Sequence, residues 1–385
     1  MEPQITDASA ARSFLKKADE LADARDNRGK RHHLPFVLGS VTLAILAGRS
    51  KLSSIQRYLQ YKIDGLCDIT ELPAQPVISR AHLPRRLAGV DWASLNDVLE
   101  PFFGIRVRQT AQQEGVASEG KTLRGPITAT DTQGQRLLLA VTHSGRAPLA
   151  QRPLTGPKKS AITATRERLA ETGLAQQKVT LDALPCKPQT TAQLNAARGS
   201  YLTQVKEKQR QLLTQLRQVA ESQSPCAQTE RVEKAQGRLT LRQGRLLALA
   251  ATRFAPRWAA SDRASLVLMT RQTTAMRTDK VTTGGSYYLS NQTCATSSQD
   301  VAAELSTAIR QHWGVESDNW IRDVTWQEDQ VKTKDGNQGQ ILGSLRTLAL
   351  ALLRKGLVEN FQAALEKFTD CPKYFQGFLR QVNFL

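Results

Sequence analysis

The distribution of apolar and polar residues along the chain first predicts a helical segment. Residues 34–47 are almost entirely apolar and predict a buried helix, and residues 53–63 predict a second helix behind a Ser-Ser cap signal. Residues 8–26 are charged and mildly periodic, and residues 25–33 predict a basic loop. After a break at Pro73 and Pro76, residues 82–103 predict two more helices. We therefore expect residues 1–110 to form a helical domain that binds DNA or dimerises, although no motif in it specifies a base sequence.

The pattern changes between residues 111 and 300. Apolar runs at 116–118, 136–143, 178–183 and 200–206 predict strands, and residues 156–174, 189–197 and 210–222 predict helices. Strands that alternate with helices predict an α/β sheet. Residues 236–250, 265–273 and 285–291 predict further strands, with a turn at 280–285. A β-rich insertion at about 223–300 is expected to interrupt the α/β domain.

The last part of the chain returns to helical patterns at residues 301–310, 312–329 and 341–354, followed by a C-terminal helical tail at 356–385. At 3.6 residues per turn, His312, Glu316, Asn319 and Asp323 fall on one helix face. Such a face suits a cation or a phosphate at the edge of a packed core. The alternative is a salt-bridged surface helix whose tryptophans pack inward. For the tryptophans themselves, we expect core positions; they are Trp313, Trp320 and Trp326.

The charge balance indicates the class of partner. The chain has 385 residues, with 53 Lys and Arg against 35 Asp and Glu, which gives a net charge of +18. A balance this basic favours a polyanion, most commonly nucleic acid, over a membrane, since no basic amphipathic helix or long apolar run is evident. The five cysteines are scattered without a CxxC pair, so neither a zinc site nor a disulfide framework is predicted. A cytoplasmic, nucleoid-associated protein is expected.

Three acids have similar positions in the predicted elements. Glu119 follows a predicted strand, Asp182 ends one, and Glu316 lies on the late helix. Two strand acids and one helix acid can converge on Mg²⁺, which prefers oxygen ligands. Metal ions in such a site activate a water or a 3′-hydroxyl for attack on a phosphodiester. The basic residues beside each acid would hold phosphates, whereas the alternative is that these acids lie in ordinary loops.

Five sequence motifs in consistent order carry a family resemblance. They are EGKTLRG (119–125), VTLDALPCK (179–187), SYLTQVKEKQ (200–209), QGRLTLR (236–242) and HWGVESDNWIRDVTWQED (312–329). They resemble the DDE transposases of bacterial insertion sequences, in the subgroup that includes the H-repeat-associated proteins. Residues 25–59 also resemble the helical domain associated with that family, so the resemblance covers roughly residues 15–355.

The resemblance implies an RNase H-like α/β catalytic domain at 111–355 that contains the β-rich insertion. It implies a Mg²⁺-dependent transposase, with Mn²⁺ as a substitute, that cleaves at transposon ends, joins them to target DNA and acts as a homodimer on double-stranded DNA. Matched by motif, the catalytic and metal-binding triad falls on Glu119, Asp182 and Glu316. Other recurrent positions are expected to contact DNA: Lys121, Arg124, Lys206, Gln209, Arg238, Arg242, His312 and Trp313.

The chain departs from the family pattern at several polar positions. Glu119 stands where the family has Asp, and the extra methylene matters because Mg²⁺ demands near-ideal octahedral geometry. Gln236 and Thr240 replace a histidine and a glutamate, and Lys208 replaces an asparagine. Ala161 and Ile162 stand where an acid is usual. These departures favour an alternative function: a weakened or repurposed transposase that binds DNA without strand transfer. A helical RNA-binding protein is a third, unrelated hypothesis.

Overall fold

The computed structural model describes residues 14–99, 115–124, 135–154, 158–249, 255–294 and 297–384, except for residues 24, 26–29, 144, 147, 172 and 334. Part of the predicted basic loop at 25–33 and the start of the mildly periodic segment at 8–26 lie outside the described residues. The N-terminal helices are α1 (Phe14–Ala18), α2 (Leu34–Leu46), α3 (Leu52–Thr70), α4 (His82–Ala88) and α5 (Trp92–Leu99). The helices predicted at 34–47 and 53–63 are thus confirmed to within seven residues at each end, and those predicted at 82–103 are confirmed up to Leu99, since residues 100–103 lie outside the described residues.

The middle of the chain alternates strands with helices before it continues as strands alone. The strands are β1 (Val116–Leu123), β2 (Gln135–Thr142), β3 (Pro148–Leu154), β4 (Lys178–Leu181), β5 (Ser200–Val205), β6 (Ala227–Ala235), β7 (Arg238–Ala248), β8 (Ser265–Ala275) and β9 (Val281–Ser290). The helices between them are α6 (Lys158–Glu171), α7 (Pro188–Ala196) and α8 (Arg210–Ser222). Short 3₁₀ helices are η3 (Leu174–Gln176), η4 (Glu207–Gln209) and η6 (Pro256–Ser261).

Within the described residues, the strands form one mixed sheet in the order β3-β2-β1-β4-β5-β9-β8-β7-β6. Strands β1, β4 and β5 are parallel, whereas β2 and β3 extend the sheet antiparallel on one side and β9 to β6 on the other. The mixed α/β architecture is as expected. The sequence failed to predict β3 and β6, and the predicted turn at 280–285 is the start of β9. Strand β6 is rich in charge, so its backbone pairing with β7 stabilises it more than apolar burial does.

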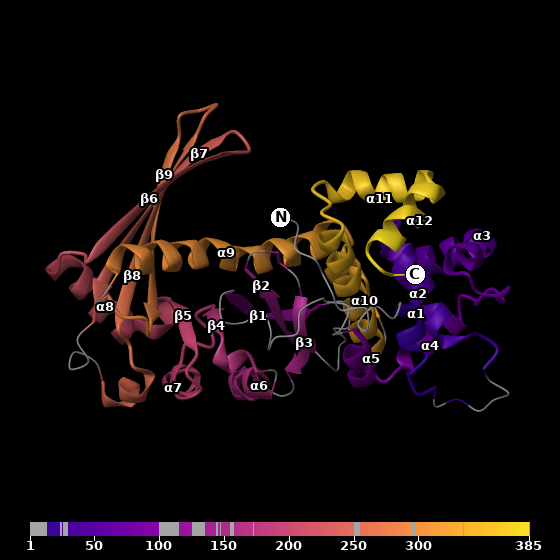
Figure 1. The fold of residues 1–385 in the computed structure, drawn as a ribbon, viewed down its shortest axis with the longest axis horizontal. Helices are drawn as coiled ribbons and strands as arrows, with labels where there is room; N and C mark the ends of the chain where they lie inside the picture. Colours follow the sequence, from indigo (N-terminus) through magenta and orange to yellow (C-terminus); the bar gives the residue numbers. More distant parts are fainter. Residues whose placement is uncertain are drawn as a thin grey trace, which may run out of the picture.

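Helices cover both faces of the sheet. Helices α6, α7 and α8 bury Leu169, Leu194 and Leu216 in a cluster with side chains such as Tyr201 of β5. Helix α9 (Ser298–Val324) lies on the opposite face, where Ile309 packs in a cluster with Leu202, because successive strand residues alternate faces. Figure 1 shows α9 running along the sheet from β8 toward α10. We predicted two helices at 301–310 and 312–329, but the structure has one helix that ends at Val324, followed by the turn η7 (Glu328–Gln330).

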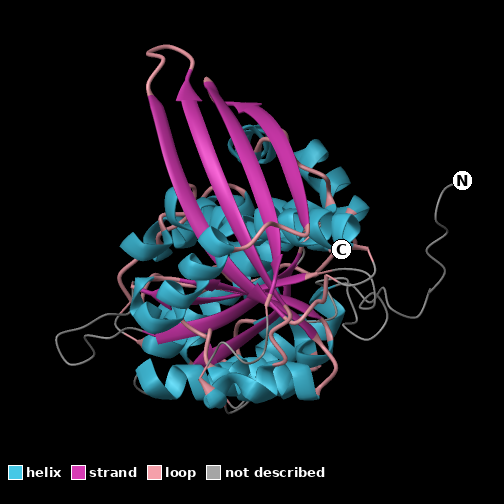
Figure 2. Ribbon diagram, turned by 90° about the vertical axis from the view of Figure 1, so that its left-hand side faces the viewer, coloured by secondary structure: helices cyan, strands magenta, loops and turns pink. Residues whose placement is uncertain are grey.

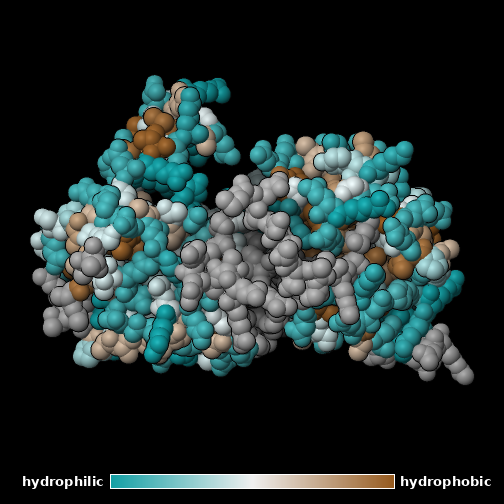
Figure 3. Space-filling model, viewed as in Figure 1, coloured by the Kyte–Doolittle hydropathy of each residue, from teal (hydrophilic) through white to brown (hydrophobic). Residues whose placement is uncertain are grey.

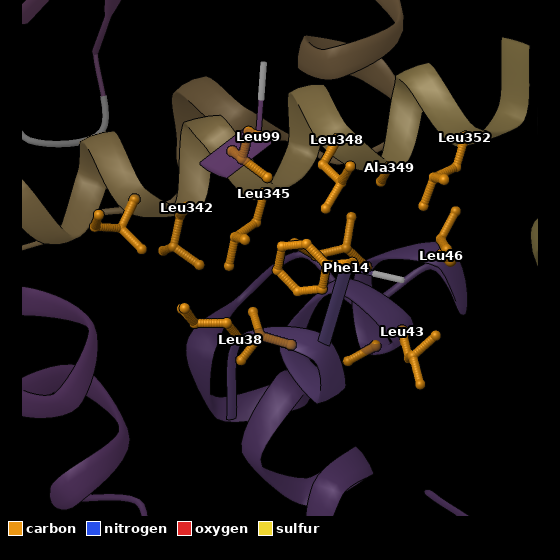
Figure 4. Close-up of a cluster of buried hydrophobic side chains, with 14 of the residues drawn as sticks. Phe14, Leu38, Leu43, Leu46, Leu99, Leu342, Leu345, Leu348, Ala349 and Leu352 are labelled. Carbon is orange, nitrogen blue, oxygen red and sulfur yellow. The ribbon is translucent and has the colours of Figure 1, made fainter. Parts of the chain in front are cut away.

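The C-terminal helix α10 (Gly336–Lys355) lies in the largest apolar cluster, as predicted for residues 341–354. Leu342, Leu345, Leu348 and Leu352 face the N-terminal helices in Figure 4. Helices α11 (Phe361–Asp370) and α12 (Pro372–Gln381) join the same cluster. The predicted division at residue 110 stays a prediction, since residues 100–114 lie outside the described residues. Among the described residues, no helix combines the length and apolar character that a bilayer crossing requires.

A buried charge network joins the end of α9 to α10 and β1. Glu328 is 3% exposed, and its Oε1 accepts a hydrogen bond of 2.8 Å from Arg322 Nη2. Arg346 Nη1 lies 3.4 Å from the same oxygen, and Lys121 Nζ lies 3.6 Å from Oε2. Burial by itself would raise the pKa of Glu328, but Arg322, Arg346 and Lys121 lower it to about 2. The network fixes the residues that follow α9 against the core, where Trp326 Nε1 donates to the Ile45 carbonyl at 3.1 Å.

We expect Glu328→Gln to destabilise the protein by about 3 kcal/mol near neutral pH, because it leaves buried cations without their anion. The pKa of Glu328 is depressed from 4.5 to about 2, so the wild-type advantage is full above pH 4.5 and is lost as the pH falls toward 2. Urea unfolding over this range measures it. The matched control is Glu207→Gln, which breaks an exposed pair with Arg217 and should change stability by less than about 1 kcal/mol. Equal losses in both variants would contradict the role of the buried network.

Candidate active site

Two of the predicted acids lie side by side at the edge of the parallel strands. Strand β1 pairs with β4 up to Ser118 and Leu181, so Glu119 and Asp182 are the next residue on each strand. Glu119 does not follow β1, as predicted, but lies within it, because antiparallel pairing with β2 continues to Leu123. The two acids therefore lie next to each other at the point where β4 ends, while β1 continues to Leu123.

Helix α9 packs a polar face against the sheet beside these two acids. The Nδ1 atom of His312 is 2.8 Å from Thr180 Oγ1 in β4, and Asn319 Nδ2 donates to Glu119 Oε2 at 3.2 Å. One turn later, Asp323 accepts from Lys121 Nζ at 2.8 Å. The predicted face of His312, Glu316, Asn319 and Asp323 is thus the face that meets the sheet, rather than a plain solvent face.

The environment of Glu119 favours its neutral form. Burial, followed by the charges of Glu316 and Asp182, raises the pKa of Glu119 to about 7. Burial also raises the pKa of Glu316; Lys206 opposes this shift, and Asp182 adds to it. These shifts show that the three carboxylates interact electrostatically, and that a cation would relieve their repulsion.

Lys206 supplies a positive charge beside Asp182. Its Nζ lies 2.6 Å from Asp182 Oδ1, so that the pKa of Asp182 is lowered although burial opposes the shift. Gln209 accepts from the Lys206 backbone N–H at 3.0 Å and donates to the carbonyls of Ala183 and Cys186. Gln209, predicted to contact DNA, therefore uses its amide group to hold the end of β5 against the loop after Asp182.

A basic cleft opens beside Asp182. It has a volume of about 550 Å³, and its lining includes Lys187, Lys206, Lys208 and Arg217. Asp182 and Glu207 also line it. Four cations against two carboxylates give the cleft a positive character suited to a phosphate backbone.

The first motif contributes two cations in different settings. Lys121 is buried and holds Asp323 and Glu328, so it binds carboxylates inside the protein instead of facing solvent. Arg124 is exposed, and its Nε lies 3.6 Å from Asp329. His312 is half-buried, and its loss of solvent lowers its pKa to about 4, which leaves it neutral near pH 7. Of these three, only Arg124 presents a positive charge at the surface.

Arg238 and Arg242 lie on β7, in strands that project beyond the helical layers (Figure 2). Arg238 is exposed, whereas Arg242 is half-buried with its Nε 3.4 Å from Glu233 of β6. The structure therefore places them on a different part of the surface from the three acids, in the same strands that the sequence predicted.

The three tryptophans behave differently from one another. Trp326 is fully buried as expected, but Trp313 is 39% and Trp320 62% exposed, so the prediction of core positions is wrong for both. The reason is that α9 turns the face of His312 and Asn319 toward the sheet, and each tryptophan follows one of those residues, about 100° around the helix. Exposed indole rings beside the acids are available to stack on a partner.

The oxygen ligands at this site suit a hard cation. Glu119, Asp182 and Glu316 offer carboxylates, and the buried Oδ1 of Asn319, beside Glu119, accepts no hydrogen bond from any described residue. In the part of the chain that the structure describes, no group of three or more His, Cys, Asp or Glu side chains is close enough to enclose one metal ion. At Asp182, the ammonium of Lys206 donates to Oδ1, an oxygen that would otherwise be available to a metal ion.

Two residues at the site were missed by sequence reasoning. His143, at the end of β2, places Nε2 2.9 Å from Thr180 Oγ1, so Thr180 joins His143 to His312. Burial lowers the pKa of His143 to about 4, which keeps both rings neutral. The signal available was strand alternation, because Thr180 lies two residues before Asp182 and shares its face.

Several known bacterial proteins are similar to this chain in sequence. The chain is 22% identical over 356 residues to "Putative transposase YncI" of Escherichia coli O157:H7, which covers 89% of this chain and 87% of that protein. It is 25% identical over 260 residues, 66% of each chain, to "H repeat-associated putative transposase YhhI" of Escherichia coli K12. It is 30% identical over 235 residues, 57% of this chain and 75% of the relative, to an uncharacterized protein in the dhlA 3′ region of Xanthobacter autotrophicus.

No protein-family model matches the chain. Similarity to YncI and to "Putative protein YbfL" of Escherichia coli K12 nevertheless extends over about nine-tenths of its length. The chain therefore belongs to the family of bacterial transposase-like proteins that includes the H repeat-associated proteins.

Proposed function

We propose that this protein is a DDE-type DNA transposase that cleaves insertion-sequence ends and joins them to target DNA. One observation carries the proposal: helix α9 holds Asn319 within 3.2 Å of Glu119, and the charges of Glu316 and Asp182 both raise the pKa of Glu119. Acids from two strands and one helix thus act on one another, as an acidic triad requires. The surrounding sheet of β1 to β5 is compatible with the RNase H-like domain that the motifs imply.

The ligand chemistry of the site suits Mg²⁺, or Mn²⁺ in its place. Glu119, Asp182 and Glu316 would hold the metal, which when bound would activate the attacking hydroxyl and stabilise the leaving oxygen. Lys206 neutralises Asp182 in the absence of that charge. Asn319 and the neutral pair His143 and His312 fix the position of α9 over the strands without adding charge.

The basic cleft beside Asp182 suits the phosphate backbone of the DNA. Lys187, Lys206 and Lys208 would position phosphates next to the acids, and Arg124 and the exposed Trp313 would extend the contact along the same surface. Arg238 and Arg242 would meet a more distant part of the duplex. The helical domain at residues 1–110 and a homodimer on DNA complete the proposed organisation, in the cytoplasm and at the nucleoid.

A second function is favoured by the departures at the acids. Glu119 is longer than the aspartate expected there, and misplacing a reacting group by about 1 Å can cost on the order of 100-fold in rate. Thr240 also stands in β7 where a glutamate is expected, and it lies near Thr273 instead of a cation. A protein with these changes would bind DNA while cutting it slowly or not at all.

The deciding experiment is a Mg²⁺- and Mn²⁺-dependent cleavage assay on DNA that carries the terminal repeats flanking the gene. We expect nicking by the wild type, loss of nicking in Glu316→Gln, and an increase on the order of tenfold or more in Glu119→Asp, because the shorter acid restores the geometry. An exposed acid outside the site, Glu366→Gln in α11, serves as the control and should match the wild type.

Cleavage and joining by the wild type at full efficiency would reject the weakened-transposase hypothesis. No cleavage by the wild type, by Glu119→Asp, or by Glu119→Asp combined with Gln236→His and Thr240→Glu would reject the enzyme.

DNA binding should depend strongly on salt, because cations that contact phosphates release counterions. We expect log Kd to rise linearly with log salt concentration, and the slope to fall by about 2 when both Lys187→Gln and Lys208→Gln are made. Fluorescence anisotropy with a duplex measures it, and Lys373→Gln in α12 is a matched control at an exposed lysine outside the cleft. Affinity that stays constant from low to moderate salt is the result that the charge argument does not allow.

The raised pKa of Glu119 can be tested without DNA. The pKa of Glu119 is raised from 4.5 to about 7, so the folded protein loses stability as the pH rises through this window. We expect Glu119→Gln to raise the Tm by about 2–4 °C above pH 7 and to leave it unchanged below pH 4.5. Thermal unfolding by circular dichroism at both pH values measures this. A gain that is equal at both would show that the pKa of Glu119 is not raised in the folded protein.

A further inference from the structure

Four strands extend beyond the body of the protein as an arm, which comprises residues 230–243 and 270–285 of β6 to β9 (Figures 1 and 2). Many of its side chains are exposed on both faces, in contrast to the buried inner halves of β7 and β8. Hydrophobic residues nevertheless lie on its surface in Figure 3. The exposed apolar side chains of the arm are Val232, Leu239, Met276 and Val281.

Strand β6 forms one edge of the sheet. Among the described residues it pairs with β7 and with no other strand, so its outer edge is available to another backbone. Helix α9 lies close to the start of this strand, where Gln299 Nε2 donates to the Gln228 carbonyl at 2.9 Å. From Glu230 to Ala235 every residue except Glu233 is exposed, and Val232, at the middle of the charged run, is 58% exposed.

The order of charges on this edge is complementary to the same order in an antiparallel copy. The sequence Glu-Arg-Val-Glu-Lys at 230–234 would pair with a second, antiparallel copy centred on Val232. Each Glu230 then lies opposite Lys234 of the other copy, each Arg231 lies opposite Glu233, and the two Val232 side chains meet at the centre. The register therefore contains four opposite-charge pairs and no like-charge pair.

Other two-fold registers lack this property. In a symmetric antiparallel pair whose axis is normal to the sheet, one residue lies opposite its own copy, since paired residues must share a face. Centring the pair on Glu230, Arg231, Glu233 or Lys234 places two identical charges opposite each other, which is destabilising. Only a centre at Val232 avoids this within the charged run.

We propose that two copies of this chain associate by antiparallel pairing of their β6 strands, centred on Val232. Backbone hydrogen bonds between the strands supply the attraction, and the four charge pairs fix the register. Charges on an edge strand usually prevent strand addition. Here their order permits addition of one partner, an identical strand, and opposes strands with other sequences. The surface lies on the arm and uses none of the acids of the proposed active site.

Cross-linking tests the centre of the pair. We expect Val232→Cys to form a dimer at high yield with a short thiol-reactive cross-linker, because directly opposed residues have Cβ atoms about 5 Å apart. Val281→Cys is the matched control, since this valine is similarly exposed but lies on β9, at the opposite edge of the arm from β6. The wild type measures the background from exposed Cys226 and Cys371. Equal yields from Val232→Cys, Val281→Cys and the wild type would overturn the proposal.

Charge reversal tests the register in solution. Lys234→Glu makes both Glu230–Lys234 pairs repulsive, so we expect dimerisation about tenfold weaker than in the wild type. Adding Glu230→Lys reverses both members and should restore the wild-type constant. Sedimentation equilibrium without DNA or metal measures the mass against that of the 42.5 kDa chain. A monomeric wild type at high micromolar concentration, or a double variant as weak as Lys234→Glu, would reject the pairing, whatever the outcome of the cleavage assays.

Discussion

The packing of helix α9 across the sheet is the interaction on which the site depends. Its 27 residues reach from the strands of the arm to the core around α10. Apolar residues such as Ile309 hold its first half on the strands, whereas polar contacts to Thr180, Glu119 and Lys121 hold its second half. The apolar contacts fix the axis of the helix. The polar contacts fix its rotation, so that the face with Glu316 is turned toward the strand acids.

The end of α9 is held by charges that have no part in the proposed chemistry. Arg322 and Glu328 are both buried, and Lys121 and Arg346 complete their network. A buried ion pair adds little net stability, but it favours one arrangement of its partners. The motif at 312–329 therefore combines two tasks, since one set of its residues meets the strand acids and another connects the helix to the core.

The acids and cations are balanced differently at the two surfaces of the protein. At the candidate active site, burial and mutual repulsion raise the pKa of Glu119 and Glu316, while Lys206 pairs with Asp182 and only partly offsets the shift at Glu316. On the arm, acids and bases alternate along β6 and compensate one another. The first arrangement favours a cation or a phosphate-bearing ligand, and the second favours a partner with the same alternating charges. Pairing with a second copy would then use a surface apart from the three acids, on the arm that also carries Arg238 and Arg242.

Local patterns in the sequence determined much of the fold. The apolar run at 34–47, the strand around Val179 and the periodicity of residues 341–354 each specify an element through short-range propensity and burial. The helical spacing also indicated which face of α9 carries His312, Glu316, Asn319 and Asp323. Motif order was enough to indicate the family, because it does not depend on where the elements lie in space.

Tertiary structure decided what the chain pattern could not. That Glu119 lies inside β1, that Lys121 is buried against Asp323 and Glu328, and that Trp320 is exposed all follow from how α9 and the strands meet. Strand β6 was missed because its stability comes from backbone pairing with β7, which leaves no apolar period in its own sequence. Sequence specifies elements through contacts near in the chain, whereas burial, ion pairing and sheet edges depend on residues that are distant in it.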